Sequence, residues 1–287
     1  MTPRIANGVR CVLGENPLWD ADAQAWYWTD ITRGCVYRQA YGSARVDTVH
    51  EGGVVGGFTL QVDGSLLLFM ADGRIARLAD GVLVSVVDAI EEERGTRFND
   101  VIADPRGRVL CGTLPTASRL GRLYRLDLDG GLTVVLDGIQ CSNGLAFSRD
   151  GAHLYYTDSY AHVIYRIAYQ EATGELGPPA VFLTVPEAEG LPDGLVRDAD
   201  DCLWSARWGG YGVVRHAPDG RVRSRLAVPA RHVTSVAFGG PHLTEMLITT
   251  AADLDAAPAD AAGAVFIVDT GLRGVLEHRS RILDTFG

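Results

Sequence analysis

Residues 96–114 read TRFNDVIADPRGRVLCGTL, and they show the pattern from which the fold can be predicted. Apolar and β-branched residues flank the turn-forming stretch DPRG at 104–107, which predicts two antiparallel strands joined by a hairpin. Asn99 and Asp100 stand at the start of the first strand, close behind Arg97. A cation and two oxygen-rich side chains are unexpected at the start of an otherwise apolar strand. Their meaning depends on whether the arrangement returns elsewhere in the chain.

The pattern returns in six segments, each with a strand, a tight turn and a second strand. The segments are GENPLWDADAQAWYWTD, GGFTLQVDGSLLLFM, FNDVIADPRGRVLCGT, SNGLAFSRDGAHLYYTD, PDGLVRDADDCLWSARW and VTSVAFGGPHLTEMLITT. When they are aligned, one position holds Glu15, Gly57, Asn99, Asn143, Asp193 and Thr234, at intervals of 42, 42, 44, 50 and 41 residues. A period in the forties with several strands per unit is typical of a β-propeller. We therefore predict an all-β, six-bladed β-propeller that forms a single domain over residues 1–287. Residues 8–13, GVRCVL, are expected to supply the outermost strand of the last blade and close the ring.

The composition narrows the function. A chain of 287 residues with 47% hydrophobic and 22% charged residues suits a soluble globular protein, and no apolar run is long enough for a membrane helix. No basic region followed by an apolar run opens the chain, so we expect a cytoplasmic protein. The net charge of −10 and the scattered basic residues argue against a nucleic-acid partner. The five cysteines lack a Cys-x-x-Cys pair and are expected to be reduced core residues.

The aligned position is the candidate site. In a propeller, the loop leading into each innermost strand lies at the mouth of the central channel, so equivalent positions form a ring. Four of the six ring positions hold oxygen donors, namely Glu15, Asn99, Asn143 and Asp193. Taken singly, each is more simply a turn residue, but their shared position favours one site for a divalent metal ion. Oxygen ligands favour calcium, magnesium or manganese, and zinc stays possible.

The remaining turns and motifs give no indication of a second catalytic site. The turns at 104–107, 148–151, 198–201 and 217–220 are expected between the first and second strands of their units, as solvated hairpins at the opposite end. The chain has no Gly-x-Ser-x-Gly elbow, no phosphate loop and no histidine spacing of a zinc site. Metal-assisted hydrolysis is the chemistry that the candidate ring favours.

Several motifs resemble those of the family of regucalcin (senescence marker protein), gluconolactonase and luciferin-regenerating enzyme. The resemblance is carried by LGENPLWD, RFNDVIADPRGRVLCGT, SNGLAFSRDGAHLYYTDS and LPDGLVRDADDCLWSARWGG, and it extends over nearly the whole chain. It implies a six-bladed propeller in which Glu15, Asn143 and Asp193 hold one divalent metal ion. It also implies that Asp193 is the general base and that Arg97 and Asn99 contact a sugar-like substrate.

The resemblance predicts a metal-dependent lactonase that hydrolyses an aldonolactone, similar to gluconolactone, to the aldonic acid. Two alternatives stay open: hydrolysis of a phosphotriester or another ester at the same site, and a calcium-binding regulatory propeller without turnover. Two residues depart from the family pattern. Asn16 stands where glycine is usual, and it could narrow the pocket or add a donor beside Glu15. Arg207 stands where an apolar residue is common, and we expect a structural role for it in preference to recognition of an anionic substrate.

Overall fold

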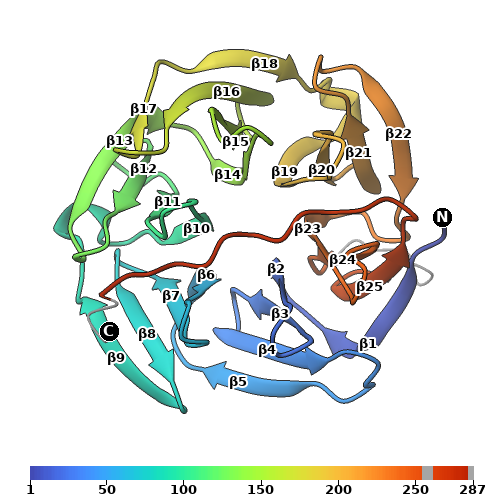
Figure 1. The fold of residues 1–287 in the computed structure, drawn as a ribbon, viewed down its shortest axis with the longest axis horizontal. Helices are drawn as coiled ribbons and strands as arrows, with labels where there is room; N and C mark the ends of the chain where they lie inside the picture. The colour runs from blue at the N-terminus through green and yellow to red at the C-terminus, as the bar shows by residue number, and fades with distance from the viewer. Residues whose placement is uncertain (254–260, 284–287) are drawn as a thin grey trace.

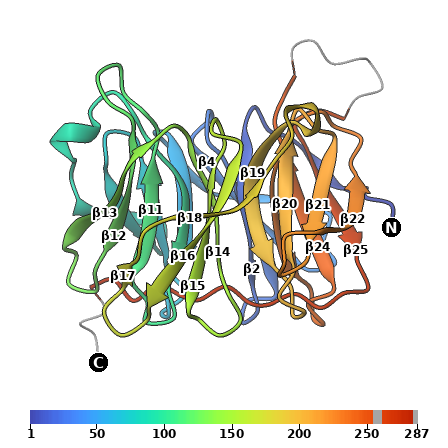
Figure 2. The same cartoon turned by 90° about the horizontal axis from the view of Figure 1, so that it is seen from above.

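Six antiparallel sheets surround one central axis in the computed structural model, which describes residues 1–253 and 261–283 (Figures 1 and 2). Each sheet has four or five strands; in five of the six the first strand in the sequence lies nearest the axis, whereas the sheet that contains the N-terminal strand has that strand at its outer edge (Figure 1). The prediction of an all-β, six-bladed propeller is therefore confirmed. The prediction of a single domain covers residues 1–287, of which 254–260 and 284–287 are outside the described residues, and it stays a prediction.

The first three blades follow the predicted repeat, from the innermost strand outward. Blade 1 contains β2 (Gly14–Asp20), β3 (Ala25–Asp30), β4 (Cys35–Ala40) and β5 (Asp47–Glu51). Blade 2 contains β6 (Val55–Leu60), β7 (Leu66–Met70), β8 (Ile75–Ala79) and β9 (Val82–Val87). Blade 3 contains β10 (Phe98–Ala103), β11 (Val109–Thr113), β12 (Gly121–Leu126) and β13 (Leu132–Ile139). A short 3-10 helix, η1 (Glu91–Glu93), precedes blade 3.

The last three blades repeat the arrangement with small variations. Blade 4 contains β14 (Ser142–Phe147), β15 (His153–Asp158), β16 (Val163–Gln170), β17 (Glu175–Leu176) and β18 (Ala180–Thr184). After η2 (Glu187–Glu189), blade 5 contains β19 (Leu191–Arg197), β20 (Leu203–Trp208), β21 (Gly212–His216) and β22 (Val222–Ala227). Blade 6 contains β23 (Val233–Gly239), β24 (Glu245–Thr250), β25 (Ala264–Asp269) and β1 (Arg4–Arg10).

The first strand of the chain closes the ring. β1 pairs antiparallel with β25, so that Arg4 lies opposite Ile267 and Ile5 opposite Phe266. In Figure 1 the blue β1 lies beside the red β25 at the edge of blade 6. The predicted closure is confirmed, with a strand that begins four residues earlier than the predicted segment. Pairing the two ends of the chain in one blade removes the free edge that an open ring would leave.

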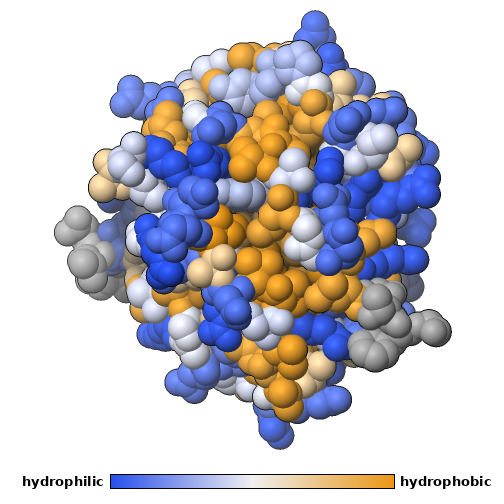
Figure 3. Space-filling model, turned by 90° about the vertical axis from the view of Figure 1, so that its left-hand side faces the viewer, coloured by the Kyte–Doolittle hydropathy of each residue, from blue (hydrophilic) through white to orange (hydrophobic). Residues whose placement is uncertain are grey.

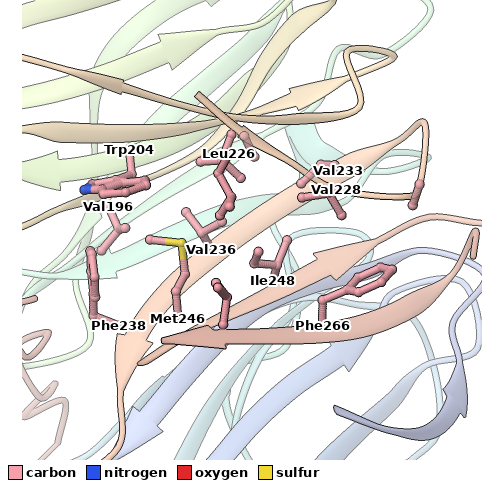
Figure 4. Packing of buried hydrophobic residues seen from close by; sticks show 14 of the residues in the cluster. Val196, Trp204, Leu226, Val228, Val233, Val236, Phe238, Met246, Ile248 and Phe266 are labelled. Carbon is pink, nitrogen blue, oxygen red and sulfur yellow. The ribbon is translucent and has the colours of Figure 1, made fainter. Parts of the chain in front are cut away.

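The hydrophobic core is divided among the six interfaces between neighbouring blades. Alternate side chains of a strand face opposite neighbours, as when Leu154 and Tyr156 of β15 pack toward blade 3 while Tyr155 packs toward blade 5. Figure 4 shows the interface of blades 5 and 6, where Trp204 and Phe238 meet edge to face at 5.8 Å. Because packing is placed between the blades, polar residues are free to line the central channel.

Two of the hairpin turns hold buried carboxylates that we expected to be exposed to solvent. Asp104 and Asp198 are each 1% exposed, where we expected solvated carboxylates. Asp104 forms an ion pair with Arg108, while Asp198 accepts hydrogen bonds from Trp204 Nε1 at 2.9 Å and Arg215 Nε at 2.7 Å. The turn at 217–220 also differs, because it joins the third and fourth strands of blade 5. The prediction overlooked two arginines that pair with these carboxylates, Arg108 in the same hairpin as Asp104 and Arg215 in β21.

A C-terminal strap, residues 270–283, crosses the face of the propeller at which the innermost strands end. It runs in dark red across the centre of Figure 1 and along one side of the disk in Figure 2. Its backbone bonds several blades: Ala199 N donates to Arg273 O at 2.8 Å, Ser280 N to Leu60 O at 2.9 Å, and Arg281 N to Gly107 O at 2.8 Å. The sequence motifs did not predict this segment.

The outer strands carry scattered apolar side chains. Val82, Val84 and Val134 are 60%, 56% and 42% exposed. Figure 3 shows apolar residues interspersed with hydrophilic ones on the side that lies at the left of Figure 1. Surface residues of this kind are common and need no partner. In the described part of the chain, no helix is long and apolar enough to cross a membrane.

Candidate active site

A pocket of about 220 Å³ opens at the end of the channel where the innermost strands begin. Its lining includes all five residues predicted for the site, which come from four blades and are brought together only by the fold. The lining residues are Leu13, Glu15, Arg97, Asn99, Leu114, Cys141, Asn143, Ser159, Tyr160, Leu191, Asp193 and Trp208.

A β-bulge positions the ring residues. In each blade, the pairing between the first and second strands shifts register near the aligned position, for example between Glu15 and Leu18 and between Asn143 and Leu145. An extra residue at a bulge bends the strand and redirects a side chain. The ring residues therefore lie in the first residues of the innermost strands, not in the loops before them as we predicted.

Two buried aspartates hold the backbone segments that directly precede two of the ring positions. Asp30, at the end of β3, accepts hydrogen bonds from Val12 N at 2.8 Å and Leu13 N at 3.2 Å, just before Glu15. Asp158, at the end of β15, accepts from the backbone nitrogens of residues 140 and 141, just before Asn143. Equivalent Thr-Asp pairs in AWYWTD and HLYYTD thus hold Glu15 and Asn143 in place.

A chain of hydrogen bonds orients the amide side chains of the pocket. Arg97 Nη1 donates to Asn99 Oδ1 at 2.6 Å, and Asn99 Nδ2 donates to Asn143 Oδ1 at 3.0 Å. Asn143 Nδ2 then donates to Ser159 Oγ at 2.9 Å, and Ser159 Oγ donates to Pro192 O at 2.6 Å. The donor at one end and the carbonyl at the other fix which amide atom is oxygen. Asn99 Oδ1 thus accepts from Arg97 and Asn143 Oδ1 accepts from Asn99, and each amide oxygen has a second lone pair for a further partner.

The two carboxylates of the pocket have no ion pair with any described residue. Glu15 is 3% and Asp193 5% exposed, and burial together with their mutual repulsion raises the pKa of Glu15 well above its usual range. Burial, followed by the nearby Asp100, also raises the pKa of Asp193. Asp193 Oδ1 has no hydrogen-bond partner within residues 1–253 and 261–283, and Glu15 Oε2 accepts one from Asn16 N at 3.1 Å.

These donors fit a hard divalent cation. An unpartnered buried oxygen and two adjacent carboxylates are what such an ion would neutralise, and Asn143 Oδ1 adds a third oxygen. Among the described residues no three His, Cys, Asp or Glu side chains gather as a metal site, and the predicted set accordingly has two carboxylates and one carboxamide.

Comparison with known proteins gives the family of the chain. The family model described as SMP-30/Gluconolactonase/LRE-like region matches residues 13–252. The chain belongs to this family. A pentonolactonase of Haloferax volcanii is 43% identical over 280 residues, which cover 95% of this chain and 96% of the relative. A 6-deoxy-6-sulfogluconolactonase of Pseudomonas putida is 35% identical, with 83% of each chain covered. The crystal structure of a calcium-binding protein, regucalcin, from Agrobacterium tumefaciens matches with a TM-score of 0.91 at 27% identity, covering 98% of each chain.

Two ring positions of this SMP-30/gluconolactonase-like propeller hold no site residue. A Cβ on Gly57 would lie 2.8 Å from both Asn16 Oδ1 and the backbone oxygen of Asn99, so the position is closed to side chains. Thr234 Oγ1 donates to Gly14 O at 2.6 Å, which joins blade 6 to blade 1. These positions contribute to contacts between blades.

Sequence reasoning missed several lining residues of the SMP-30/gluconolactonase-like pocket. Ser159 and Tyr160 directly follow the HLYYTD strand, and this adjacency to an aligned strand end was a usable signal. Trp208 ends β20, where its alternation with buried residues gave no indication of a pocket. Cys141 lines the pocket, but burial raises the pKa of its thiol to about 12, which leaves it without a nucleophilic thiolate. All five cysteines are free and buried, as predicted.

The two departures from the SMP-30/gluconolactonase-like pattern are explained by their contacts. Asn16 adopts a φ of 47°, in the left-handed region that asparagine tolerates, and its Oδ1 accepts from Phe58 N at 2.6 Å. It joins blades 1 and 2 and does not line the site pocket. Arg207 is 1% exposed and donates from Nη2 to His216 Nε2 at 3.0 Å, away from the pocket. Its role is structural.

Proposed function

We propose that this protein is a metal-dependent lactonase that hydrolyses a neutral aldonolactone to the aldonic acid. The observation that carries the proposal is the meeting of Glu15, Asn143 and Asp193 in one pocket where Asp193 Oδ1 is buried without a partner. The relative named pentonolactonase, which is 43% identical over nearly the whole length of both chains, supports the substrate class. Lactones of five-carbon and six-carbon sugars are therefore the substrates to compare.

The pocket residues divide the work of ester hydrolysis. Asp193 accepts the proton of the attacking water as the water oxygen bonds to the lactone carbonyl carbon. The ring C–O bond then breaks, and the ring oxygen leaves as a hydroxyl with the proton that Asp193 returns. Arg97 donates hydrogen bonds to the substrate's hydroxyl oxygens, Asn99 Oδ1 accepts one from a substrate hydroxyl, and together they hold the carbonyl carbon in place. Leu114, Leu191 and Trp208 supply the apolar walls of the pocket.

Glu15, Asn143 and Asp193 are the residues that would hold the metal ion. When bound, a divalent cation supplies positive charge that polarises a carbonyl and lowers the pKa of water. Asp193 has two carboxylate oxygens, so one can hold an ion while the other accepts a proton. The oxygen-only donor set favours calcium, magnesium or manganese, and zinc stays possible.

A second candidate function is calcium binding without turnover. It is favoured by the similarity to the Agrobacterium tumefaciens protein described as calcium-binding. A regulatory calcium protein needs the carboxylates but has no use for the oriented chain from Arg97 through Asn99 to Asn143. The ester alternatives, phosphotriesters among them, would use the same residues.

Turnover of a lactone panel tests the proposal. The purified protein is incubated with pentonolactones, hexonolactones and a phosphotriester, and acid release is followed before and after chelation and after metal is restored. We expect hydrolysis of at least one sugar lactone that stops with chelator and returns with metal. Metal binding without hydrolysis of any lactone would favour the calcium-binding alternative. Hydrolysis that survives complete metal removal would contradict the metal requirement.

A small-molecule sugar lactone is the partner that this proposal requires, with no nucleic acid or membrane involved. The net charge of −10 supports the first exclusion. A cytoplasmic location stays a prediction.

A further inference from the structure

Trp208 is the tryptophan that meets the site pocket. It ends β20, lines the pocket and is partly exposed, whereas the other four tryptophans of the chain are at most 7% exposed. Leu191, which also lines the pocket, lies opposite Trp208 in the pairing of β19 with β20. Blade 5 therefore presents one large flat ring and one leucine to a ligand in the pocket.

The indole ring of Trp208 is held from behind by blade 6, the neighbour of blade 5 in the ring of blades (Figure 1). His232, which directly precedes β23, stacks on the indole with ring centroids 4.1 Å apart and planes inclined by 26°. Nε2 of His232 lies 3.6 Å from Oδ2 of Asp253, and Ala251 N donates to His232 O at 3.0 Å. His232 lies outside the pocket lining, so it covers the indole face that points away from the pocket. The opposite face is the one left for a ligand.

The pocket offers two kinds of surface, and a sugar lactone has both of their counterparts. Arg97 and Asn99 supply polar atoms on the side of blade 3, whereas blade 5 supplies the apolar wall. A lactone ring carries hydroxyl groups and also C–H groups, which the neighbouring oxygens polarise positively. The face of an aromatic ring is its negative side, so such C–H groups favour contact with it. A ring whose hydroxyl groups meet Arg97 and Asn99 can therefore turn a C–H face to Trp208.

We propose that Trp208 is the platform on which the lactone ring stacks, so that the site selects a closed sugar ring with C–H groups on one face. The inference rests on the proposed lactonase activity and adds the residue that recognises the ring. Hydrolysis opens the ring, and the open-chain acid has no flat face to stack. Trp208 therefore adds affinity for the substrate ring and none for the product.

Binding of a sugar lactam tests the platform. In an aldonolactam a ring N–H replaces the ring oxygen of the lactone, and the amide bond resists hydrolysis, so the ring stays closed. Dissociation constants of five-carbon and six-carbon aldonolactams and of the matching open-chain aldonic acids are measured by calorimetry on metal-loaded wild type, Trp208→Leu and Trp208→Phe. Acrylamide quenching of tryptophan fluorescence reports whether the lactam covers Trp208, because the other four tryptophans are buried.

Tyr211→Leu is the matched control for this experiment. Tyr211 is an aromatic residue three positions after Trp208 in the chain, is 51% exposed and lies outside the pocket lining. The same change from an aromatic ring to leucine should there leave the affinity for lactam and acid as in wild type.

We expect Trp208→Leu to bind the lactam about 3-fold to 10-fold more weakly than wild type, the usual effect of losing an aromatic stack. Its affinity for the open-chain acid and its metal content should be unchanged. Trp208→Phe, which keeps a flat ring, should recover part of the loss, and the lactam should reduce quenching in wild type. KM for an accepted lactone should rise in Trp208→Leu by a similar factor, with a smaller change in kcat.

Two results would overturn the platform while leaving the lactonase proposal intact. One is lactone hydrolysis in wild type with equal lactam affinity in Trp208→Leu. The other is an equal loss of affinity for lactam and acid in Trp208→Leu, which would make Trp208 a plain apolar wall. A wild-type protein that binds no lactam and hydrolyses no lactone would overturn both proposals.

Discussion

The side-chain nitrogen of Asn99 donates to the side-chain oxygen of Asn143 over 3.0 Å, which links blade 3 to blade 4 at the wall of the pocket. Asn99 is itself oriented by Arg97, so the guanidinium group of one arginine determines the orientation of the side-chain amides of Asn99 and Asn143. A residue that is proposed to contact the substrate is thus hydrogen-bonded to a residue that is proposed to hold the ion.

Substitution of Arg97 should weaken substrate handling more than metal binding. Arg97→Ala removes the donor that orients Asn99, and we expect kcat/KM to fall about 10-fold to 100-fold, the usual effect of losing a charged hydrogen bond. Asn99→Ala should act in the same way. Arg97→Lys, which keeps the charge but not the fork of donors, should recover part of the loss. Kinetics with metal content measured on each variant checks this, and wild-type kcat/KM in Arg97→Ala would contradict it.

Loss of either pocket carboxylate should lower metal occupancy. Glu15→Gln and Asp193→Ala each remove one of the two negative charges that favour the ion. Metal analysis after dialysis against limiting metal should show less metal at this site than in wild type. Full occupancy in both variants would show that these residues are not the ligands.

One substitution can separate the proposed role of Asp193 as proton acceptor from its proposed role as metal ligand. Asp193→Asn keeps an oxygen for the ion but removes the base, so turnover should fall on the order of a hundredfold or more while part of the metal stays bound. The measurement is the rate on an accepted lactone, paired with metal content. A metal-loaded Asp193→Asn protein that hydrolyses the lactone at near wild-type rate refutes the assignment of the base.

The buried His216 should make stability depend on pH. Burial and the adjacent Arg207 lower the pKa of His216 to about 4, so the folded protein favours the neutral ring. The unfolded chain binds the proton first as pH falls below about 6.5, so this contribution is full above that pH and is lost toward pH 4. Unfolding midpoints in urea between pH 7 and pH 4 should fall less steeply for His216→Gln than for wild type. Equal slopes would show that His216 does not carry this dependence.

Limited proteolysis should cut the propeller without releasing half of it. Each blade buries its apolar side chains against both neighbours, so no half of the ring has a complete core. We expect nicks in exposed loops followed by loss of the whole chain. A stable fragment of about half the chain's length would contradict the prediction of a single domain.

The repeat predicted the fold because a propeller imposes the same local rules six times. The aligned turns and alternating strands located Glu15, Asn99, Asn143 and Asp193 at one end of the channel before their contacts were known. The alignment identified these residues because each stands at the same position in its repeat, at the start of the first strand and before the turn that follows it.

The parts that escaped prediction depend on contacts between distant residues. Arg215 pairs with the turn aspartate Asp198 from β21, 17 residues away, and no local spacing indicates that contact. Arg108 lies in the same hairpin as Asp104, four residues later. The strap has little strand periodicity, since it bonds to the ends of several blades one residue at a time. Trp208 and Leu191 line the pocket through the curvature of the ring, which sequence alone does not specify.

The pairing of β1 with β25 has a consequence for the newborn protein. During synthesis the first strand leaves the ribosome more than 250 residues before its sheet partner exists, and its edge is exposed to other chains for that time. Asn7 Nδ2 donates to Gln39 Oε1 at 2.9 Å, so blade 1 can hold β1 as soon as β4 has formed. β1 can therefore contact blade 1 early in synthesis, before β25 is made and pairs with it.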